Sequence, residues 1–380
     1  MKRIYLDHAA ATPLDKRVKE AMEPFWSEIF ANPGNEHKDG LLAKEHLEKS
    51  RETISQILGV RREEIFFTSG GTESNSLALI GFLNYLEDKG KLDGSHIITS
   101  VIEHPSVLDI FKKYKKKGLG VDFVPVTGDG LINMRELEQM INEDTVLVSI
   151  VYVNSEIGTV QPLKEISNLI KKKNPRVVFH TDASQAPLYL EIKVDGLGVD
   201  MMSMDGQKIY GPKGVGVLYK NRNVNLSPVL LGGGQERGLR PGTENVPLIV
   251  GMAKAFEIVE SERPETLKKV LPIRDHFIDS SLNLSDKVIL NGSREYRSAG
   301  NVNISVIGQD SDFLFIKLDE KGVSCATKSV CIGEKEEGSY VLKALGSPDV
   351  KTGVRFSLGR DTTKEEIDKV IEIFSNILSD

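Results

Sequence analysis

Residues 65–86 read IFFTSGGTESNSLALIGFLNYL, and this stretch contains a β-rich run, a glycine turn and an amphipathic segment in that order. The apolar run at 65–67 has the composition of a buried strand. After the turn, apolar residues recur at near-helical spacing, at Leu77, Ile80, Leu83 and Leu86. This spacing predicts a helix. A strand that leads through a tight turn into a helix is the repeating unit of a parallel α/β sheet.

The same alternation continues along the chain. Segments with helical spacing are interleaved with further β-rich runs at 96–98, 121–124, 146–153, 176–179 and 214–219. Repeated strand–helix units form a mainly parallel sheet with helices on both faces, and ligands bind at the carboxyl ends of its strands. The sequence therefore predicts an α/β fold built on a mainly parallel mixed sheet.

The pattern changes at about residue 246. Two long helix candidates come first, then a strand candidate at 302–306 and a last helix for which Thr362 and Glu365 fit a capping box. We predict a large domain over 15–245 and a smaller α+β domain formed by 1–14 and 246–380. No repeat or long Pro/Gly/Ser linker separates them, so we expect the two to share an interface.

Composition narrows the class of protein. The 380 residues include 49 Lys and Arg against 55 Asp and Glu, a net charge of −6. Scattered basic residues and a negative charge argue against direct binding of nucleic acid or of an anionic membrane. No apolar run approaches the ~20 residues of a membrane span, and no secretory signal precedes the first strand candidate, so we expect a cytoplasmic protein. Two cysteines cannot form a disulfide framework or a four-ligand zinc site by themselves, and we predict no metal.

The turn at 68–75 is a candidate phosphate site. Adjacent glycines allow close approach of a ligand, and the following helix would present free amides and a positive dipole end. The turn lacks the lysine of a Walker A loop. The residues alone leave a second interpretation open, in which Thr72 simply caps the helix.

Two other residues have the chemistry of a pyridoxal-phosphate site. Asp182 follows the strand candidate at 176–179 and would lie at its carboxyl end. A carboxylate there can keep a pyridinium nitrogen protonated. Lys208 lies in a glycine-flanked turn, where a lysine can form a Schiff base. Taken singly, each has an ordinary alternative, a turn cap for Asp182 and a solvated amine for Lys208.

Several longer motifs make a family resemblance specific. They are YLDHAAATP at 5–13, the turn at 70–75, EHPS at 103–106, the residues at 180–185 and 208–216, GGGQERGLRPGTEN at 232–245 and VRFSLGR at 354–360. With these motifs the chain resembles the NifS/IscS-type cysteine desulfurases, which are fold-type I pyridoxal-phosphate enzymes of the class V aminotransferase family. The resemblance covers essentially the whole chain.

The resemblance implies a bound pyridoxal 5'-phosphate. It assigns Lys208 to the Schiff base with the cofactor and Asp182 to the pyridine nitrogen. It assigns Gln185 to the phenolic oxygen and stacks His104 over the ring. The carboxylate of the substrate is assigned to Arg355, whose guanidinium favours bidentate pairing.

The phosphate end departs from the family pattern. The resemblance assigns the phosphate to Gly71 and Thr72, and to Thr243 from a second subunit, which implies a homodimer. Asp205 stands where the family usually has a phosphate-binding serine, and its charge would repel a phosphate by about 1 kcal/mol or more unless it turns away or meets a cation. Gln207 replaces the usual histidine and can still donate a hydrogen bond.

Two further departures lie near the substrate. Ser155 replaces the usual asparagine before Glu156, which would remove a contact to substrate or cofactor. Cys331 resembles the catalytic cysteine of the long-loop group, but Lys328 and Val330 replace the usual Gly and Ala before it. Cys325 resembles an extra cysteine of some members, and its alternative is a small buried residue at a strand end.

We therefore predict a homodimeric cysteine desulfurase that converts L-cysteine to L-alanine. Lys208 would remove the α-proton, His104 would carry a proton, and Cys331 would take the sulfur as a persulfide. The acceptor would be an iron–sulfur scaffold or a tRNA-thiolation protein. Two alternatives stay open: a selenocysteine lyase or another class V aminotransferase-like enzyme, and a degenerate, non-catalytic dimeric scaffold that binds cofactor poorly.

Overall fold

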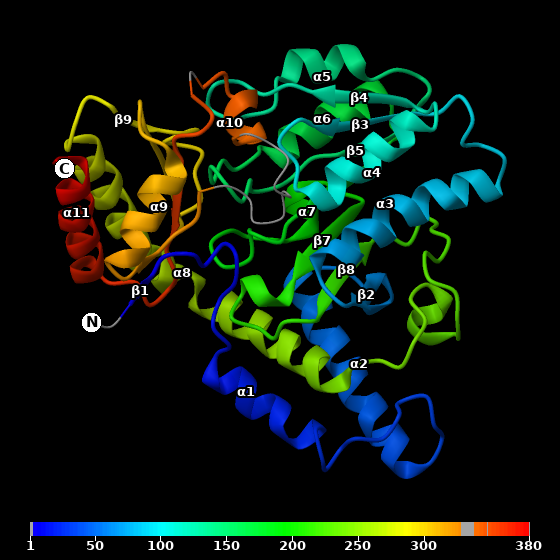
Figure 1. Cartoon of the computed structure of the whole chain (residues 1–380). Helices are drawn as coiled ribbons and strands as arrows, with labels where there is room; N and C mark the ends of the chain where they lie inside the picture. The colour runs from blue at the N-terminus through cyan, green and yellow to red at the C-terminus, as the bar shows by residue number, and fades with distance from the viewer. Residues whose placement is uncertain (1–2, 328–337, 348, 380) are drawn as a thin grey trace.

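The computed structural model describes residues 3–327, 338–347 and 349–379, and its largest element is a seven-stranded mixed sheet (Figure 1). Its strands, in spatial order, are β2 (Ile65–Thr68), β8 (Gly216–Lys220), β7 (Met201–Asp205), β6 (Val178–Asp182), β5 (Thr145–Ser149), β3 (His96–Ser100) and β4 (Gly120–Val124). β8 runs antiparallel to β2 and β7, and the other neighbouring pairs are parallel. The predicted fold class is confirmed.

Both faces of this sheet are buried. Consecutive strand residues enter different apolar clusters, as Ile97 and Ile98 do on β3 and Met201 and Met202 on β7. Side chains alternate between the two faces of a strand, so the two clusters cover opposite faces. This arrangement explains why the strands are apolar without the polar alternation of a half-exposed sheet.

Helices pack around the sheet and against one another (Figure 1). They are α1 (Lys16–Met22), α2 (Lys38–Leu58), α3 (Gly71–Asp88), α4 (Pro105–Lys116), α5 (Met134–Met140), α6 (Leu163–Lys173), α7 (Val194–Leu197) and α8 (Val246–Leu282). In the described part of the chain, none is long and apolar enough to cross a membrane.

The rest of the chain forms a second, smaller group of elements (Figure 1). A three-stranded antiparallel sheet has the order β12 (Gly353–Ser357), β10 (Asn301–Val306) and β9 (Val288–Leu290). β1 (Ile4–Tyr5) pairs in parallel with β11 (Val323–Ser324). The helices of this group are α9 (Ser311–Glu320), α10 (Tyr340–Ala344) and α11 (Lys364–Ser379). The predicted boundary at 245/246 stays a prediction, because α8 packs against α1 and α2 as well as α11.

Three local predictions differ from the structure. The capping box of α11 is formed by Thr363 and Glu366, one residue later than predicted, because the Thr362 hydroxyl accepts from the Gly359 amide instead. Instead of two long helices before the strand at 302–306, the structure has one, the 37-residue α8, and the ten-residue α9 follows that strand. The strand predicted at 146–153 ends at Ser149, and the residues after it line a cavity.

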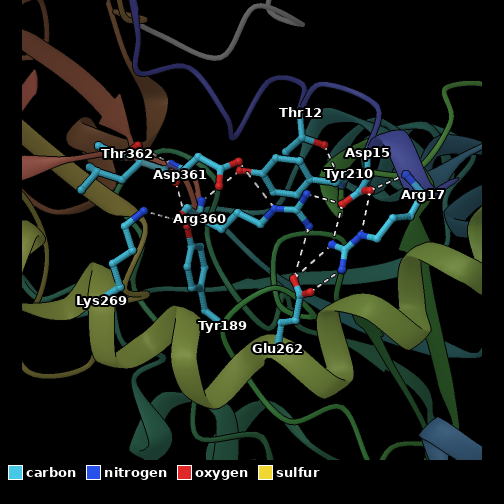
Figure 2. A network of polar contacts seen from close by, with 12 residues as sticks. Thr12, Asp15, Arg17, Tyr189, Tyr210, Glu262, Lys269, Arg360, Asp361 and Thr362 are labelled. Carbon is cyan, nitrogen blue, oxygen red and sulfur yellow. Dashed lines mark hydrogen bonds and ion pairs between the residues drawn. The ribbon is translucent and has the colours of Figure 1, made fainter. Parts of the chain in front are cut away.

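Charged side chains join the N-terminal segment to α8 and to the C-terminal region (Figure 2). The Asp15 carboxylate accepts from Arg17 at 2.8 Å and also pairs with Arg360. Arg17 in turn pairs with Glu262 of α8. These donors hold the pKa of Asp15 well below its ordinary value. The Arg360 guanidinium lies 4.1 Å from the centre of the Tyr210 ring, so the network also reaches the segment that follows β7.

The N-terminal segment is held directly against the turn that contains Lys208. The Thr12 hydroxyl donates to the carbonyl of Gln207 at 2.8 Å and accepts from the amide of Tyr210 at 2.7 Å. Tyr210 is 2% exposed and has a left-handed backbone with φ of 61°. Such a backbone costs a bulky residue of order 1 kcal/mol or more, so these contacts must hold it in place.

Candidate active site

A cavity of about 290 Å³ lies at the carboxyl ends of the parallel strands, and we call it the catalytic cavity. It is bounded by Ala9, Ala10, Gly71, Thr72, Asn75, Ile102, His104, Ser106, Val151, Val153, Asn154, Ser155, Glu156, Asp182, Ser184, Gln185, Asp205, Gln207, Lys208, Tyr340, Val341 and Arg355. Ten of the twelve predicted site residues are in this set. Thr243 does not line the cavity, and Cys331 lies outside the described residues.

Chain topology brings these side chains together. Asp182 and Asp205 are the last residues of β6 and β7, and His104 is the N-cap of α4. Gly71 begins α3, directly after β2. Parallel strands end at one edge of a sheet, so residues far apart in the sequence share this cavity.

Asp182 is 7% exposed and its carboxylate is held by two donors. Asn75 Nδ2 donates to Oδ2 at 2.8 Å, and the amide of Ser184 donates to Oδ1 at 2.9 Å. Behind it, His180 is fully buried, and burial lowers the pKa of its imidazole to about 4. Of these two residues, only Asp182 lines the cavity.

Lys208 approaches the cavity from the other side. Its Nζ donates to the carbonyl oxygens of Ala9 at 2.8 Å and Ala10 at 2.6 Å. Gln185 Nε2 also donates to the Ala9 carbonyl, at 2.8 Å. The N-terminal segment therefore forms the wall against which the predicted Schiff-base lysine rests.

The glycine turn before α3 forms a narrow cradle. A Cβ at Gly71 would lie 2.9 Å from Ser184 Oγ and 3.4 Å from Asp205 Oδ2, so any side chain at this position would displace Ser184. Gly70 is the N-cap and has no side chain to satisfy the first amides of the helix. Free amides at a helix N-terminus bind anions, so the cradle fits a phosphate.

Asp205 borders this cradle. Its Oδ1 accepts from the amide of Gln207 at 3.1 Å, and its Oδ2 accepts from Gln207 Nε2 at 3.2 Å. Gln207 thus holds the carboxylate beside Gly71 instead of turning it away. The Asp205 carboxylate therefore lies beside the proposed phosphate site, as the sequence analysis expected.

Arg355 lies on β12 and enters the cavity from the smaller group of elements. Its Nη2 pairs with Asp7 Oδ1 at 2.7 Å, and its Nη1 donates to the carbonyl of Ser155 at 3.0 Å. Its Nε is buried and has no partner among the described residues. Because Ser155 contacts Arg355 through its backbone, the Asn-to-Ser departure leaves this contact intact.

Two buried glutamates have no role assigned from the sequence: Glu156, which lines the cavity, and Glu103, which lies between the lining residues Ile102 and His104 in the chain. Burial raises the pKa of Glu103 to about 8 and that of Glu156 to about 7. Glu156 Oε1 accepts from Ser339, the N-cap of α10, and the carbonyl of Glu103 accepts from Tyr340 at 2.5 Å. These contacts anchor the start of α10 at the cavity. The sequence alone does not indicate that these two glutamates have raised pKa values, because the shift depends on burial in the fold.

Cys325 is the cysteine that the structure describes, and it is buried. Cys325 is 5% exposed, and burial raises the pKa of its thiol to about 12. A protonated, buried thiol is a poor nucleophile, which favours the structural interpretation of Cys325.

Thr243 is exposed on the loop that follows β8. Two ion pairs hold this loop against the rest of the chain: Glu236 with Arg51 at 2.6 Å, both buried, and Arg240 with Glu73 at 2.9 Å. The predicted role of Thr243 toward a second subunit stays a prediction.

Taken together, the cavity fits pyridoxal phosphate. Its lining includes an anion cradle at Gly71, a buried carboxylate at Asp182 and a primary amine at Lys208. The poorest match is Asp205, which adds a negative charge beside the cradle.

Comparisons with known proteins show which proteins the chain is similar to. The family model for class-V aminotransferases matches residues 4–370. The cysteine desulfurase IscS of Dictyoglomus turgidum is 40% identical over 381 residues, which cover 100% of this chain and 95% of the relative. Cysteine desulfurase IscS 1 of Archaeoglobus fulgidus is 40% identical, with 98% of this chain and 96% of the relative covered.

Solved structures show the same similarity. A NifS-like protein matches with a TM-score of 0.92 and 36% identity over 99% of both chains. A structure described as SspA in complex with cysteine matches with a TM-score of 0.80 and 34% identity, covering 93% of this chain and 98% of the other.

Proposed function

This chain belongs to the class-V aminotransferase family, and we propose that it is a pyridoxal-phosphate-dependent cysteine desulfurase. The observation that carries the proposal is the catalytic cavity, in which Lys208, Asp182 and Arg355 meet. Relatives named cysteine desulfurase match the chain over its full length at 40% identity. A related structure was solved in complex with cysteine.

Different residues of the cavity would bind different parts of the cofactor. Asp182 would hold the pyridine nitrogen, Gln185 the phenolic oxygen, and His104 a ring face. Gly71 and Thr72 would hold the phosphate. When bound, pyridoxal phosphate supplies an electron-withdrawing ring that stabilises the negative charge left at the α-carbon of an amino acid after deprotonation.

Arg355 is the residue that binds the carboxylate of the substrate. Its guanidinium is buried at the cavity, and its Nε hydrogen has no acceptor among the described residues. An unpaired buried donor costs of order 1–3 kcal/mol, which a carboxylate would recover. Asp7 and the Ser155 carbonyl fix the orientation of the guanidinium, so the substrate carboxylate would bind to it in one orientation.

Lys208 removes the α-proton. To do so, Nζ must leave the carbonyls of Ala9 and Ala10 and present a lone pair to the substrate. These carbonyls accept hydrogen bonds and stabilise the ammonium form, and they can therefore receive Lys208 Nζ once it has taken up the α-proton. The N-terminal segment is thus part of the proton-transfer machinery.

Cys331 receives the sulfur. Its thiolate bonds to the sulfur of L-cysteine while the carbon–sulfur bond of the substrate breaks, and protonation of that carbon gives L-alanine. The substrate carbon is reduced, its sulfur is oxidised to the sulfane level, and the enzyme retains a persulfide. No external oxidant or reductant is needed. Ser339 and Tyr340, which follow Cys331 in the sequence, are anchored at the cavity by Glu156 and Glu103.

The chain works as a homodimer in this proposal. Large apolar side chains are exposed in the described fold: Leu231 at 91%, Phe30 at 75% and Trp26 at 56%. Exposed groups of this size favour burial against a second copy. The exposed Thr243 loop would then reach the phosphate of the partner subunit.

The persulfide passes to a sulfur acceptor such as an iron–sulfur scaffold or a tRNA-thiolation protein. We infer a cytoplasmic location for both, which cell fractionation tests directly.

Product analysis tests the proposed activity. The full chain, loaded with pyridoxal phosphate, should convert L-cysteine to equal amounts of L-alanine and, with a thiol reductant, sulfide. Turnover of L-selenocysteine without turnover of L-cysteine would replace the proposal with a selenocysteine lyase. No product from either amino acid, with a colourless protein, would support the non-catalytic scaffold.

A further inference from the structure

A continuous chain of hydrogen-bonded side chains crosses the wall of the catalytic cavity from His104 to Asp182. His104 Nδ1 accepts from the amide of Ser106 at 3.2 Å and lies 2.8 Å from Ser106 Oγ. Asn75 Nδ2 lies 2.9 Å from the same Oγ and 2.8 Å from Asp182 Oδ2. The four residues come from the segments around α4, α3 and β6, so tertiary structure alone assembles them.

The direction of each hydrogen bond follows from the two ends of this chain. A backbone amide can only donate, so Nδ1 of His104 must accept and carries no proton. At the other end the Asp182 carboxylate oxygen accepts, which requires the Asn75 amide nitrogen to face it. The second hydrogen on Asn75 Nδ2 then goes to Ser106 Oγ. This leaves the hydroxyl proton of Ser106 for His104 Nδ1, and every donor in the chain is used once.

We propose that Asn75 and Ser106 are positioning residues that hold His104 as its Nε2–H tautomer. A neutral imidazole of this tautomer has one lone pair at Nδ1, and the Ser106 amide and hydroxyl share it in a three-centre hydrogen bond. Its Nε2 is therefore a hydrogen-bond donor and cannot accept a proton. His104 acts in the cavity as a donor, and removal of the α-proton falls to Lys208.

The arrangement exceeds what a helix cap requires. Capping α4 needs only the contact between the Ser106 amide and His104 Nδ1. The hydroxyl of Ser106 and the Asn75 amide add a path to the residue proposed for the pyridine nitrogen. Asn75 is 1% exposed and Ser106 is partly buried, so water does not replace these partners easily. The catalytic consequence rests on the proposed function, whereas the tautomer does not.

Nitrogen NMR of the ring tests the tautomer directly. The full chain would be labelled with ¹⁵N in its histidine rings and measured with and without pyridoxal phosphate. The His104 signals are identified by their loss in His104→Gln. We expect a non-protonated Nδ1 and a protonated Nε2 in both samples. Ser106→Ala and Asn75→Ala should shift the two signals part of the way toward each other, because the longer contact from the residue-106 amide, at 3.2 Å, then holds the tautomer without support from the hydroxyl contact at 2.8 Å. Ser106→Thr, which keeps the hydroxyl, should restore the parent spectrum.

Ser50→Ala is the matched control, because it also removes one buried serine hydrogen bond but lies on α2, outside the cavity. It should leave the His104 signals unchanged. In the loaded enzyme, Ser106→Ala should lower kcat about five- to tenfold, the loss expected for one hydrogen bond.

Two results would overturn the inference. A proton on Nδ1 of His104 in the parent chain would refute the assigned tautomer. Parent-like spectra in both Ser106→Ala and Asn75→Ala would show that the cap amide alone sets the tautomer and that the relay has no positioning role. Neither result depends on turnover, so failure of the proposed function would leave this test intact.

Discussion

Restoring the serine that the family usually has at position 205 should tighten the binding of pyridoxal phosphate. The Asp205 carboxylate is held beside the cradle by both donors of Gln207, and its Oδ2 lies 3.4 Å from the Cβ that an alanine at position 71 would have. A phosphate on the first amides of α3 would therefore have its charge about 5 Å from this carboxylate.

The size of the effect follows from Coulomb's law. Two unit charges about 5 Å apart repel by roughly 1 kcal/mol at the dielectric constant of water and by roughly 3 kcal/mol at an effective value of about 20. The two donors of Gln207 reduce the charge felt by the phosphate. We therefore expect Asp205→Ser to lower the Kd about tenfold, within a range of about 5- to 150-fold.

The assay is titration of cofactor-free protein with pyridoxal phosphate, followed by absorbance. Asp205→Ser, Gln207→His and the double variant are compared with the parent chain, and position 205 should contribute the larger share. Asp109→Ser, which removes an equal charge from the exposed face of α4, is the control and should leave the Kd unchanged. Equal or weaker binding in Asp205→Ser would refute the reasoning and show that this carboxylate is part of the phosphate site.

Three further predictions concern the lysine, the cysteines and a buried acid. Lys208→Ala should keep the fold but lose the cofactor adduct that borohydride traps, with the exposed Lys213→Ala as control; a trapped adduct in Lys208→Ala would contradict the assignment. Cys331→Ala should bind cofactor but release no sulfide, whereas Cys325→Ala should be nearly silent because its thiol stays protonated, and sulfide assays showing the reverse would mean that the cysteines are misassigned. Burial raises the pKa of Glu103 from 4.5 to about 8, so the folded chain binds this proton more tightly and stability falls as pH rises between those values. Glu103→Gln should therefore stabilise the chain by about 1–3 kcal/mol at pH 9 and change little at pH 5 in thermal denaturation, unlike the exposed Glu63→Gln; equal shifts at both pH values would argue against a titrating Glu103.

Much of the fold follows from local sequence. The glycine turn after 65–67 is where the pattern predicts it, because buried strands and tight turns have strong compositional signals. Asp182 lies at the carboxyl end of a strand as predicted, although that strand spans 178–182 and not 176–179. β7 has no such signal. Its residues are MMSMD, and methionine is not typical of strands. β7 nevertheless lies between β8 and β6, and apolar clusters cover both of its faces.

The side-chain contacts of the site could not be predicted in the same way. Asn75 and Asp182 are 107 positions apart, and Asp7 and Arg355 are 348 apart. No periodicity links such pairs, since only the packed sheet brings them within hydrogen-bond distance. The raised pKa of Glu103 likewise depends on complete burial, which single-sequence patterns do not determine.

Mass spectrometry of the protein after one turnover tests the central claim most directly. The loaded full chain is mixed with less than one equivalent of L-cysteine, quenched, alkylated and digested. The account predicts one additional sulfur atom on the peptide that contains Cys331 and an equal amount of L-alanine. Alanine without a persulfide, or a persulfide on Cys325 with none on Cys331, would contradict it.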